Sequence, residues 1–325
     1  MNITQLLEIT AKHQASDLHV SVGYPPILRV QGQLQKLGSQ ALNEDQVTSI
    51  CYQLTTPEQR EKFSHERNLD FAYHLHDVCR FRVHIFTERR GFAIALRLIP
   101  EQIPDFTNYR NFETLRNLIS QKSGLILLTG ATGSGKSTTL AAMTEFFNQR
   151  EALHIVSIED PIEFIYQGKR SIIHQREVGH DVSDFSQGLR SALREDPDVI
   201  ILGELRDLES IRLALQAAET GHLVLASLHA NSAAKAIDRL IDSFPGDEKN
   251  LVRLILAESL LGIVHQNLVA RKEGATRELI QEILINTPAV KNLIREHKIA
   301  QIEATMETSG HIGMKTMAQA LRENF

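Results

Sequence analysis

The chain has 325 residues, of which 42% are hydrophobic and 23% are charged, and its formal net charge is −5. This is the composition of an ordinary globular protein that is long enough for two domains, and it excludes a disordered or fibrous chain. Because the sequence has no basic block or tail, its charge gives no indication of nucleic-acid binding.

The cysteines and the start of the chain indicate the cellular compartment. Cys51 and Cys79 are the only cysteines, a pattern unlike a disulfide framework or a zinc ribbon, which favours a reducing compartment. The N-terminus lacks the basic and apolar regions of a signal peptide, and no apolar run approaches the roughly 18 residues of a membrane-spanning helix. We therefore expect a cytoplasmic protein without an integral membrane segment, whose membrane association is peripheral and runs through a partner.

The first hundred residues predict a mixed α+β domain. The expected elements, in chain order, are a helix over residues 1–13, a hairpin over 20–34, a helix over 43–62 capped by Asn43, and strands over 69–75, 80–86 and 92–98. We predict that this domain spans residues 1–99 and that residues 100–112, which begin with a proline-rich stretch, form a linker.

From about residue 113 the pattern changes to that of an α/β domain, which we expect to extend to residue 325. Short apolar strands alternate with helical stretches, as in a parallel sheet. The expected strands are 125–129, 153–158, 198–202 and 223–227. Beyond Pro245 the chain is expected to be mainly helical, with a long helix over 247–265 and a shorter one over 289–296.

The first of these strands leads into the P-loop pattern, Gly130-x-x-x-x-Gly135-Lys136-Ser137. Its glycines let consecutive backbone N–H groups turn toward phosphates. Lys136 supplies positive charge to the β- and γ-phosphates, Ser137 supplies a hydroxyl ligand for Mg²⁺, and the next helix adds its positive N-terminal end. The pattern predicts a site for ATP and Mg²⁺ that consists of Gly130, Ala131, Thr132, Gly133, Ser134, Gly135, Lys136, Ser137 and Thr138.

Two acidic segments follow later strands. Glu204 comes just after the strand at 198–202, where a Walker B carboxylate reaches Mg²⁺ or the attacking water. Glu159, Asp160 and Glu163 lie within five residues of one another, and their repulsion predicts that Mg²⁺ or neighbouring arginines offset it. A solvated acidic turn is the alternative interpretation of the second segment.

Two histidines and two arginines are further candidates. His222 and His229 flank the strand at 223–227 and could sense the γ-phosphate, although single histidines near strand ends are more often structural. Arg82 and Arg97 lie on strands of the first domain. They are either exposed charges or arginine fingers that reach the ATP of a neighbouring subunit, where a finger contributes ~10³–10⁵ in rate. The spacing does not decide between these alternatives.

Together these segments resemble the type II/IV secretion ATPase superfamily and, within it, the pilus-retraction (PilT-like) branch. The resemblance covers nearly the whole chain and rests on several motifs in the right order. These are the opening at 15–21, the Walker A motif at 130–137, the Asp box at 158–163, the segment 189–198 that leads into Walker B, the His box between 221 and 229, and the motif at 289–296 associated with retraction.

The resemblance implies a PAS-like N-terminal domain and a RecA-like ATPase domain, assembled into a ring-shaped homo-hexamer with nucleotide between the two domains. It assigns roles to individual residues. Lys136 becomes the phosphate clamp, Ser137 the Mg²⁺ ligand, Glu163 the general base, Glu204 the Walker B acid and metal ligand, His222 and His229 the sensors, and Arg82 and Arg97 the candidate arginines acting in trans.

The implied function is a motor that hydrolyses ATP to drive type IV pilus retraction and twitching motility, acting on an inner-membrane platform protein, with a second retraction ATPase as a further candidate partner. Ala131, Leu205 and Ala230 depart from the residues common in the family, and the chain ends at Phe325, where relatives continue. None of the three substitutions touches a phosphate-contacting group, so ATP hydrolysis is still expected. The departures suit a divergent paralogue that serves another machine.

Three other functions remain as alternatives. An assembly or type II secretion ATPase typically carries a four-cysteine zinc motif, which two separated cysteines do not supply. A DNA or RNA translocase conflicts with the acidic charge balance. A catalytically silent ring subunit conflicts with the intact Lys136, Glu163 and Glu204.

Overall fold

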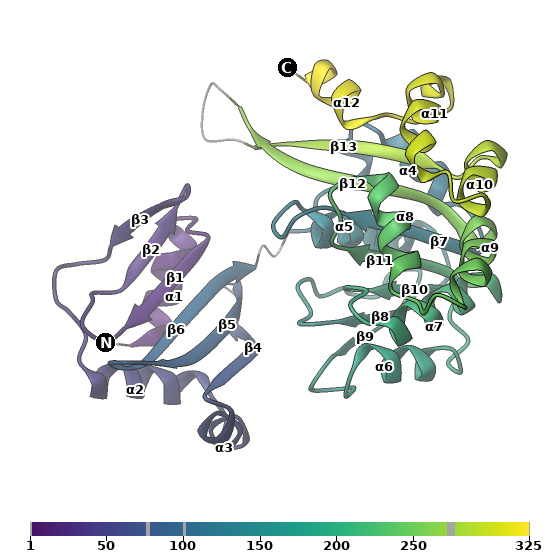
Figure 1. Ribbon diagram of the computed structural model, residues 1–325. Coiled ribbons are helices and arrows are strands. Elements are labelled where there is room, and N and C mark those ends of the chain that lie inside the picture. The colour runs from purple at the N-terminus through teal and green to yellow at the C-terminus, as the bar shows by residue number, and fades with distance from the viewer. Residues whose placement is uncertain (1, 76–78, 100–101, 272–276, 325) are drawn as a thin grey trace. The chain divides into compact units, whose positions relative to one another are not determined.

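The computed structural model describes residues 2–75, 79–99, 102–271 and 277–324, and the chain divides into two compact units, Met1–Gln102 and Ile103–Phe325 (Figure 1). We call them unit 1 and unit 2. The boundary lies within the predicted linker 100–112, of which residues 100–101 lie outside the described residues. Much of the remaining linker is structured, because it contains the 3₁₀ helix Phe106–Asn108 and the start of a helix at Phe112.

Unit 1 is a six-stranded antiparallel sheet with helices packed on it, as the α+β prediction requires. The strand order is β3-β2-β1-β6-β5-β4. The helices are α1 (Ile3–Lys12), α2 (Glu44–Leu54) and α3 (Pro57–Glu66), and the strands are β1 (Asp17–Ser21), β2 (Ile27–Val30), β3 (Gln33–Lys36), β4 (Asn68–Leu75), β5 (Cys79–Glu88) and β6 (Gly91–Ile99). Alternate residues of β5 are buried in the core, which is the pattern of a half-buried strand.

The predicted helix at 43–62 is two helices. The predicted cap at Asn43 is confirmed, since its side chain accepts a hydrogen bond from the Gln46 backbone N–H. In return, the Gln46 side chain accepts one from the Asn43 backbone N–H. The chain then leaves the helical conformation at Thr55 and restarts with Thr56 as N-cap and Pro57 at the first helical position. The residue before a proline avoids the helical region, which explains the break.

Unit 2 is a seven-stranded sheet with helices on both faces (Figure 1). The strand order is β13-β12-β7-β11-β10-β8-β9, and all neighbours are parallel except the β12–β13 pair. The strands are β7 (Gly124–Thr129), β8 (His154–Glu159), β9 (Ile172–Glu177), β10 (Val199–Leu202), β11 (Leu223–Leu228), β12 (Leu260–Ala270) and β13 (Arg277–Ile285). The helices are α4 (Phe112–Ile119), α5 (Lys136–Arg150), α6 (Phe185–Ala192), α7 (Leu208–Glu219), α8 (Ala233–Asp242), α9 (Lys249–Ser259), α10 (Pro288–Arg295), α11 (Ile302–Thr308) and α12 (Met317–Asn324).

The central strands of unit 2 are buried on both faces, which is why they appear in the sequence as unbroken apolar runs. In β7, Leu125 and Leu127 pack in the core with α6 to α10, whereas Ile126 and Leu128 pack in the core with α4 and α5. The four predicted strands of this unit are confirmed. The parallel order brings the carboxyl ends of β7, β11, β10 and β8 to one edge of the sheet, where α5 begins.

The prediction of a mainly helical C-terminal part is wrong for Leu260–Ala270 and Arg277–Ile285, which are strands. The expected helix 247–265 ends as α9 at Ser259, and the chain continues as β12 beside β7. A short, continuously apolar run has no periodicity that separates a buried strand from a buried helix. The Asn286 side chain fixes the change, because its amide donates to the carbonyl oxygens of Ala257 (2.9 Å) and Leu260 (2.6 Å). The helix predicted at 289–296 is confirmed as α10.

Among the described residues, no helix is both long and apolar enough to span a bilayer.

Candidate active site

The P-loop connects the buried strand β7 to helix α5. Gly130 and Gly133 have positive φ angles, and Gly135 caps α5 in the left-handed conformation. A side chain on Gly130 would place its Cβ 2.4 Å from the Gln266 carbonyl oxygen and 2.5 Å from Ser134 Oγ. The first glycine is therefore required by close packing against β12 as well as by its backbone conformation.

Lys136 occupies the first position of α5 and its side chain turns back over the loop. The Nζ atom donates to the carbonyl oxygens of Gly130 and Ala131, each at 3.0 Å. Burial lowers the pKa of Lys136, and the charges of Glu204 and Glu163 act in the opposite direction. The ammonium group thus lies within the electrostatic reach of both acidic segments, although they are far from it in the sequence.

Glu204 follows β10 and is brought to the P-loop edge by Gly203. The backbone N–H of Gly203 donates to the Ile158 carbonyl (2.8 Å), and a Cβ at Gly203 would lie 3.2 Å from the Glu159 Cα. A side chain at the strand tip would therefore press against the neighbouring strand end. The carboxylate lies at the next position, Glu204, with 18% of its side chain exposed.

His229 follows β11 and connects the P-loop to Glu204. Its Nδ1 lies 3.2 Å from the Gly130 carbonyl oxygen, and its Nε2 lies 3.2 Å from Glu204 Oε1. The ring of His229 therefore lies between the P-loop backbone and the Glu204 carboxylate.

The acidic residues at the end of β8 lie in different surroundings. Glu159 is half-buried at the end of β8, and its desolvation raises its pKa to about 7, while it accepts hydrogen bonds from Ser157 (2.8 Å), Gln175 (3.3 Å) and the Glu163 backbone. Asp160 pairs with Arg206 at 3.1 Å, so an arginine offsets its charge as predicted. Glu159 is thus hydrogen-bonded to the loop that carries Glu163, whose charge acts on Lys136.

Several buried polar residues around the P-loop were not predicted. Gln266 donates to Thr139 of α5 (2.8 Å), and His265 Nδ1 lies 3.1 Å from Thr129 Oγ1. Burial and the charge of Lys136 lower the pKa of His265. His265 and Gln266 lie on β12, where the sequence predicted a mainly helical region, so no pattern in the sequence indicated that they pack beside the P-loop. Arg206 was also missed, although its position two residues after Glu204 was a usable signal.

His222 lies at the opposite edge of the sheet from the P-loop. Its Nδ1 is 3.1 Å from the Ala217 carbonyl, and its own carbonyl accepts from Gly124 at the start of β7. The six residues of β11 separate it from His229, a span of about 20 Å at 3.3 Å per residue. The expectation that both histidines lie on the nucleotide side is wrong within one chain, because they occupy opposite ends of one strand.

Arg82 and Arg97 are neighbours on the sheet of unit 1. They face each other across the β5–β6 pair, and Arg97 Nε donates to Asp17 Oδ1 at 3.0 Å. Like charges directly opposite each other destabilise a sheet, and Asp17 offsets part of this repulsion. The arrangement costs stability, which favours a functional reason for the pair.

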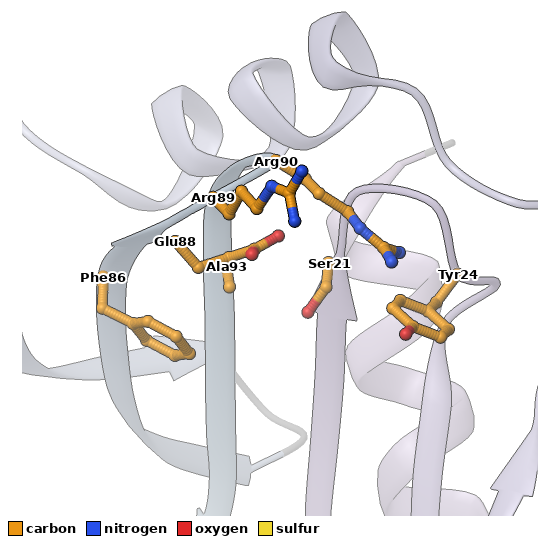
Figure 2. Close-up of a pocket in the computed structure, with 7 residues that line it drawn as sticks. All are labelled: Ser21, Tyr24, Phe86, Glu88, Arg89, Arg90 and Ala93. Carbon is orange, nitrogen blue, oxygen red and sulfur yellow. The ribbon is translucent and has the colours of Figure 1, made fainter.

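A separate cavity of about 620 Å³ lies in unit 1 at the turn between β5 and β6. Figure 2 shows Arg89 and Arg90 extending from this turn above Ser21, with the Arg90 guanidinium 5.1 Å from the centre of the Tyr24 ring. Arg82 and Arg97 do not line this cavity, so the two arginine pairs of unit 1 are distinct.

Comparison with known proteins places this geometry in a family. The family model described as type II/IV secretion system protein matches residues 2–315. The chain belongs to this family. It is 47% identical over 322 residues to the type IV pilus retraction ATPase PilT of Pseudomonas aeruginosa, covering 99% of this chain and 93% of PilT. It is also 46% identical over 321 residues to the uncharacterised protein YggR of Escherichia coli K12, covering 98% and 97% of the two chains.

A solved structure extends the similarity to three dimensions. The crystal structure of the pilus retraction motor PilT with bound ADP superimposes with a TM-score of 0.91 and 41% identity, covering all of this chain and 93% of PilT. The chain is therefore a nucleotide-binding ATPase of the type II/IV secretion family. Its two-unit fold, with an N-terminal α+β unit and a P-loop unit, is that of its relative.

Proposed function

We propose that this protein is a motor ATPase that hydrolyses ATP to drive type IV pilus retraction. The observation that carries the proposal is the nearly full-length identity to PilT, together with a P-loop edge at which Lys136, His229 and Glu204 are connected. As a member of this motor family, the protein would act at the cytoplasmic face of the inner membrane on a platform protein. A second retraction ATPase is a further candidate partner.

We assign the residues of the P-loop edge to distinct steps. The P-loop backbone and Lys136 bind the phosphates, and Ser137, which is exposed at the start of α5, and Glu204 have the oxygen chemistry that Mg²⁺ prefers. When bound, Mg²⁺ neutralises charge that develops on the phosphates. Glu163 is the proposed general base, since its charge acts on Lys136 and its loop is held by Glu159.

The remaining site residues are assigned across subunits of a homo-hexamer. Arg82 and Arg97 are paired on one sheet and partly balanced by Asp17, which suits arginine fingers. His222 lies about 20 Å from the P-loop edge of its own chain, so a role in sensing nucleotide requires the site of a neighbouring copy. Dilution of the protein below the concentration at which the ring assembles would abolish the contributions of these arginines and of His222 to ATP hydrolysis.

A rescue experiment tests the function. The chain and its Lys136→Ala variant are expressed in a hyperpiliated strain that lacks its own retraction ATPase, and retraction events are counted. Retraction with the wild-type chain alone supports the proposal. ATP hydrolysis by the purified protein without rescue would show that this motor serves another machine.

A second candidate function is a motor of this family that serves another machine, because the chain matches YggR, whose name states no function, about as well as it matches PilT. Identity to PilT and to YggR differs by one percentage point, and each match covers nearly the whole chain. A divergent paralogue with the same ATPase cycle and a different platform partner would share all the residues of the P-loop edge. Cross-linking of the ring to membrane proteins in a strain without pili would identify such a partner.

A further inference from the structure

Arg206 links the ends of two strands that carry acidic groups. Its Nε donates to Glu204 Oε2 at 2.8 Å, and its Nη1 donates to Asp160 Oδ2 at 3.1 Å. Glu204 follows β10 and Asp160 follows the neighbouring strand β8. One guanidinium group therefore fixes the two acidic segments relative to each other.

Both oxygens of Glu204 are engaged in the described structure. Oε2 accepts from Arg206, and Oε1 faces His229 Nε2 at 3.2 Å. His229 in turn reaches the Gly130 carbonyl, which also accepts from Lys136. The carboxylate of Glu204 is thus oriented from two sides, by a cation on one side and by a ring that contacts the P-loop on the other.

The stability that the Arg206 bridge provides is small. The Arg206 side chain is 52% exposed and Asp160 is 34% exposed, and ion pairs between such partly exposed groups contribute little to stability because solvent screens them. Orientation is a different matter, because a planar guanidinium can hold two carboxylates at fixed angles and a lysine ammonium cannot. The geometry favours a role in placing Glu204 over a role in holding the fold.

We propose that Arg206 is a positioning residue of the ATPase cycle, which orients the Glu204 carboxylate through a bridge to Asp160. This inference rests on the proposed role of Glu204 in metal binding and hydrolysis. The bridge keeps the carboxylate turned toward Lys136 and His229, so hydrolysis and the metal-dependent part of nucleotide binding depend on Arg206. Binding of nucleotide by the P-loop itself does not.

The test compares Arg206→Gln, Arg206→Lys and Asp160→Asn in the full-length protein. Steady-state kinetics give kcat and KM for ATP, and a fluorescent ADP analogue gives affinities with Mg²⁺ and with EDTA. Arg212→Gln is the matched control, since Arg212 also faces two carboxylates, Glu248 at 2.7 Å and Glu209 at 4.0 Å, away from the P-loop.

We expect Arg206→Gln to lower kcat by about tenfold or more while KM for ATP stays within about threefold. The affinity for ADP in EDTA should match that of the Arg212→Gln control, and the gain in affinity on adding Mg²⁺ should fall by about threefold or more. Arg206→Lys should retain an intermediate kcat. Asp160→Asn should lower kcat by a smaller factor, and combining it with Arg206→Gln should add no further loss, because both act through one bridge.

Three results would overturn the inference. The first is a kcat for Arg206→Gln equal to that of the control. The second is a loss of ADP affinity in EDTA as large as the loss of kcat, which would make Arg206 a direct nucleotide ligand. The third is additive losses in the double variant with Asp160→Asn, a result that decides the question even if Arg206→Gln lowers the melting temperature.

Glu204→Gln in the same assays separates this inference from the proposed function. If Glu204→Gln hydrolyses ATP as the wild type does, the assigned role of Glu204 is wrong, and with it the reason for orienting the residue. If Glu204→Gln is inactive while Arg206→Gln behaves as the control does, only the inference about Arg206 fails.

Discussion

The two edges of the unit 2 sheet carry similar residue types and use them differently. At the carboxyl edge, His229 contacts the side chain of Glu204 and the P-loop, and Glu204 contacts Arg206. At the amino edge, Asp198 accepts a hydrogen bond from the His154 backbone (2.8 Å) and His222 lies against the Ala217 carbonyl. Polar side chains at the carboxyl edge are linked to one another around the P-loop. Those at the amino edge mainly contact backbone, apart from His154 and His174, whose ring nitrogens lie 3.0 Å apart.

Strand direction explains the difference. Parallel strands place every following loop at the carboxyl edge, and the positive N-terminal end of α5 lies there as well. Loops from β7, β8, β10 and β11 therefore converge on one anion-binding point. The C-terminal ends of helices lie at the amino edge, so its side chains do not surround an anion-binding point. They border a cavity of about 750 Å³.

The largest expected effect comes from removing the charge at the carboxyl edge. Lys136→Ala should lower ATP hydrolysis by about 100-fold or more, because the phosphates lose their only charged P-loop partner. A phosphate-release assay measures the rate. Lys169→Ala is the control, since Lys169 pairs with Glu145 on the surface and should leave the rate unchanged. Equal rates for the two variants would contradict the assignment of Lys136.

Variants of His229 and His222 allow a direct comparison of the two edges by their affinity for ADP. His229→Asn should weaken ADP binding by the unassembled chain about fivefold, the equivalent of one hydrogen bond of about 1 kcal/mol. His222→Asn should leave that affinity within about twofold, because its ring lies at the other end of β11. Titration of fluorescent ADP below the assembly concentration checks both values. A larger effect from His222 would place it in the site of its own chain.

Glu159 provides a pH-dependent test. Burial raises its pKa in the folded chain to about 7 from 4.5, so the folded state binds more protons between these pH values and stability falls as pH rises through this window. The difference between these two pKa values corresponds to a change in stability on the order of 3 kcal/mol. Glu159→Gln has no carboxyl group to ionise and so should not lose this stability. Its melting temperature should therefore exceed that of the wild type by an amount that grows from pH 4.5 to pH 7.

Asp184 gives a control of opposite sign. Hydrogen bonds from Ser186 and the Gln187 backbone lower the pKa of Asp184 to about 2. The stabilisation by this helix cap is present above pH 3.8 and is lost as pH falls toward 2. The difference in stability between Asp184→Asn and the wild type should therefore change with pH in the acid range only. A parallel pH profile for the two variants would refute the assignment of the slope to Glu159.

The smallest expected effect lies at the amino edge. Asp198→Asn weakens one hydrogen bond to the His154 backbone and should lower the free energy of unfolding by about 1 kcal/mol. The affinity of the unassembled chain for ADP should not change. Urea denaturation and the ADP titration measure the two quantities, and a loss of affinity would show that the edges are coupled.

Prediction from the sequence succeeded where local rules decide the structure. The P-loop has a fixed order of residue types, Asn43 is a helix cap with a characteristic neighbour, and the four apolar strands lie between turns. It failed at Leu260–Ala270, because an apolar run beside a helix has no period of its own. It also missed Arg206, whose importance depends on Asp160, a residue 46 positions away.

The sequence by itself determined that this chain is a P-loop ATPase of two units with acidic groups after its strands. Only the tertiary structure decided which groups share an edge, since strand direction separates His222 from His229, which are seven residues apart in the sequence. Tertiary packing also decided that Glu159 accepts hydrogen bonds from Ser157 and Gln175 while Asp160 pairs with Arg206. Adjacent carboxylates are equivalent in a sequence, and they acquire different chemistry only when a fold assigns each of them its own surroundings.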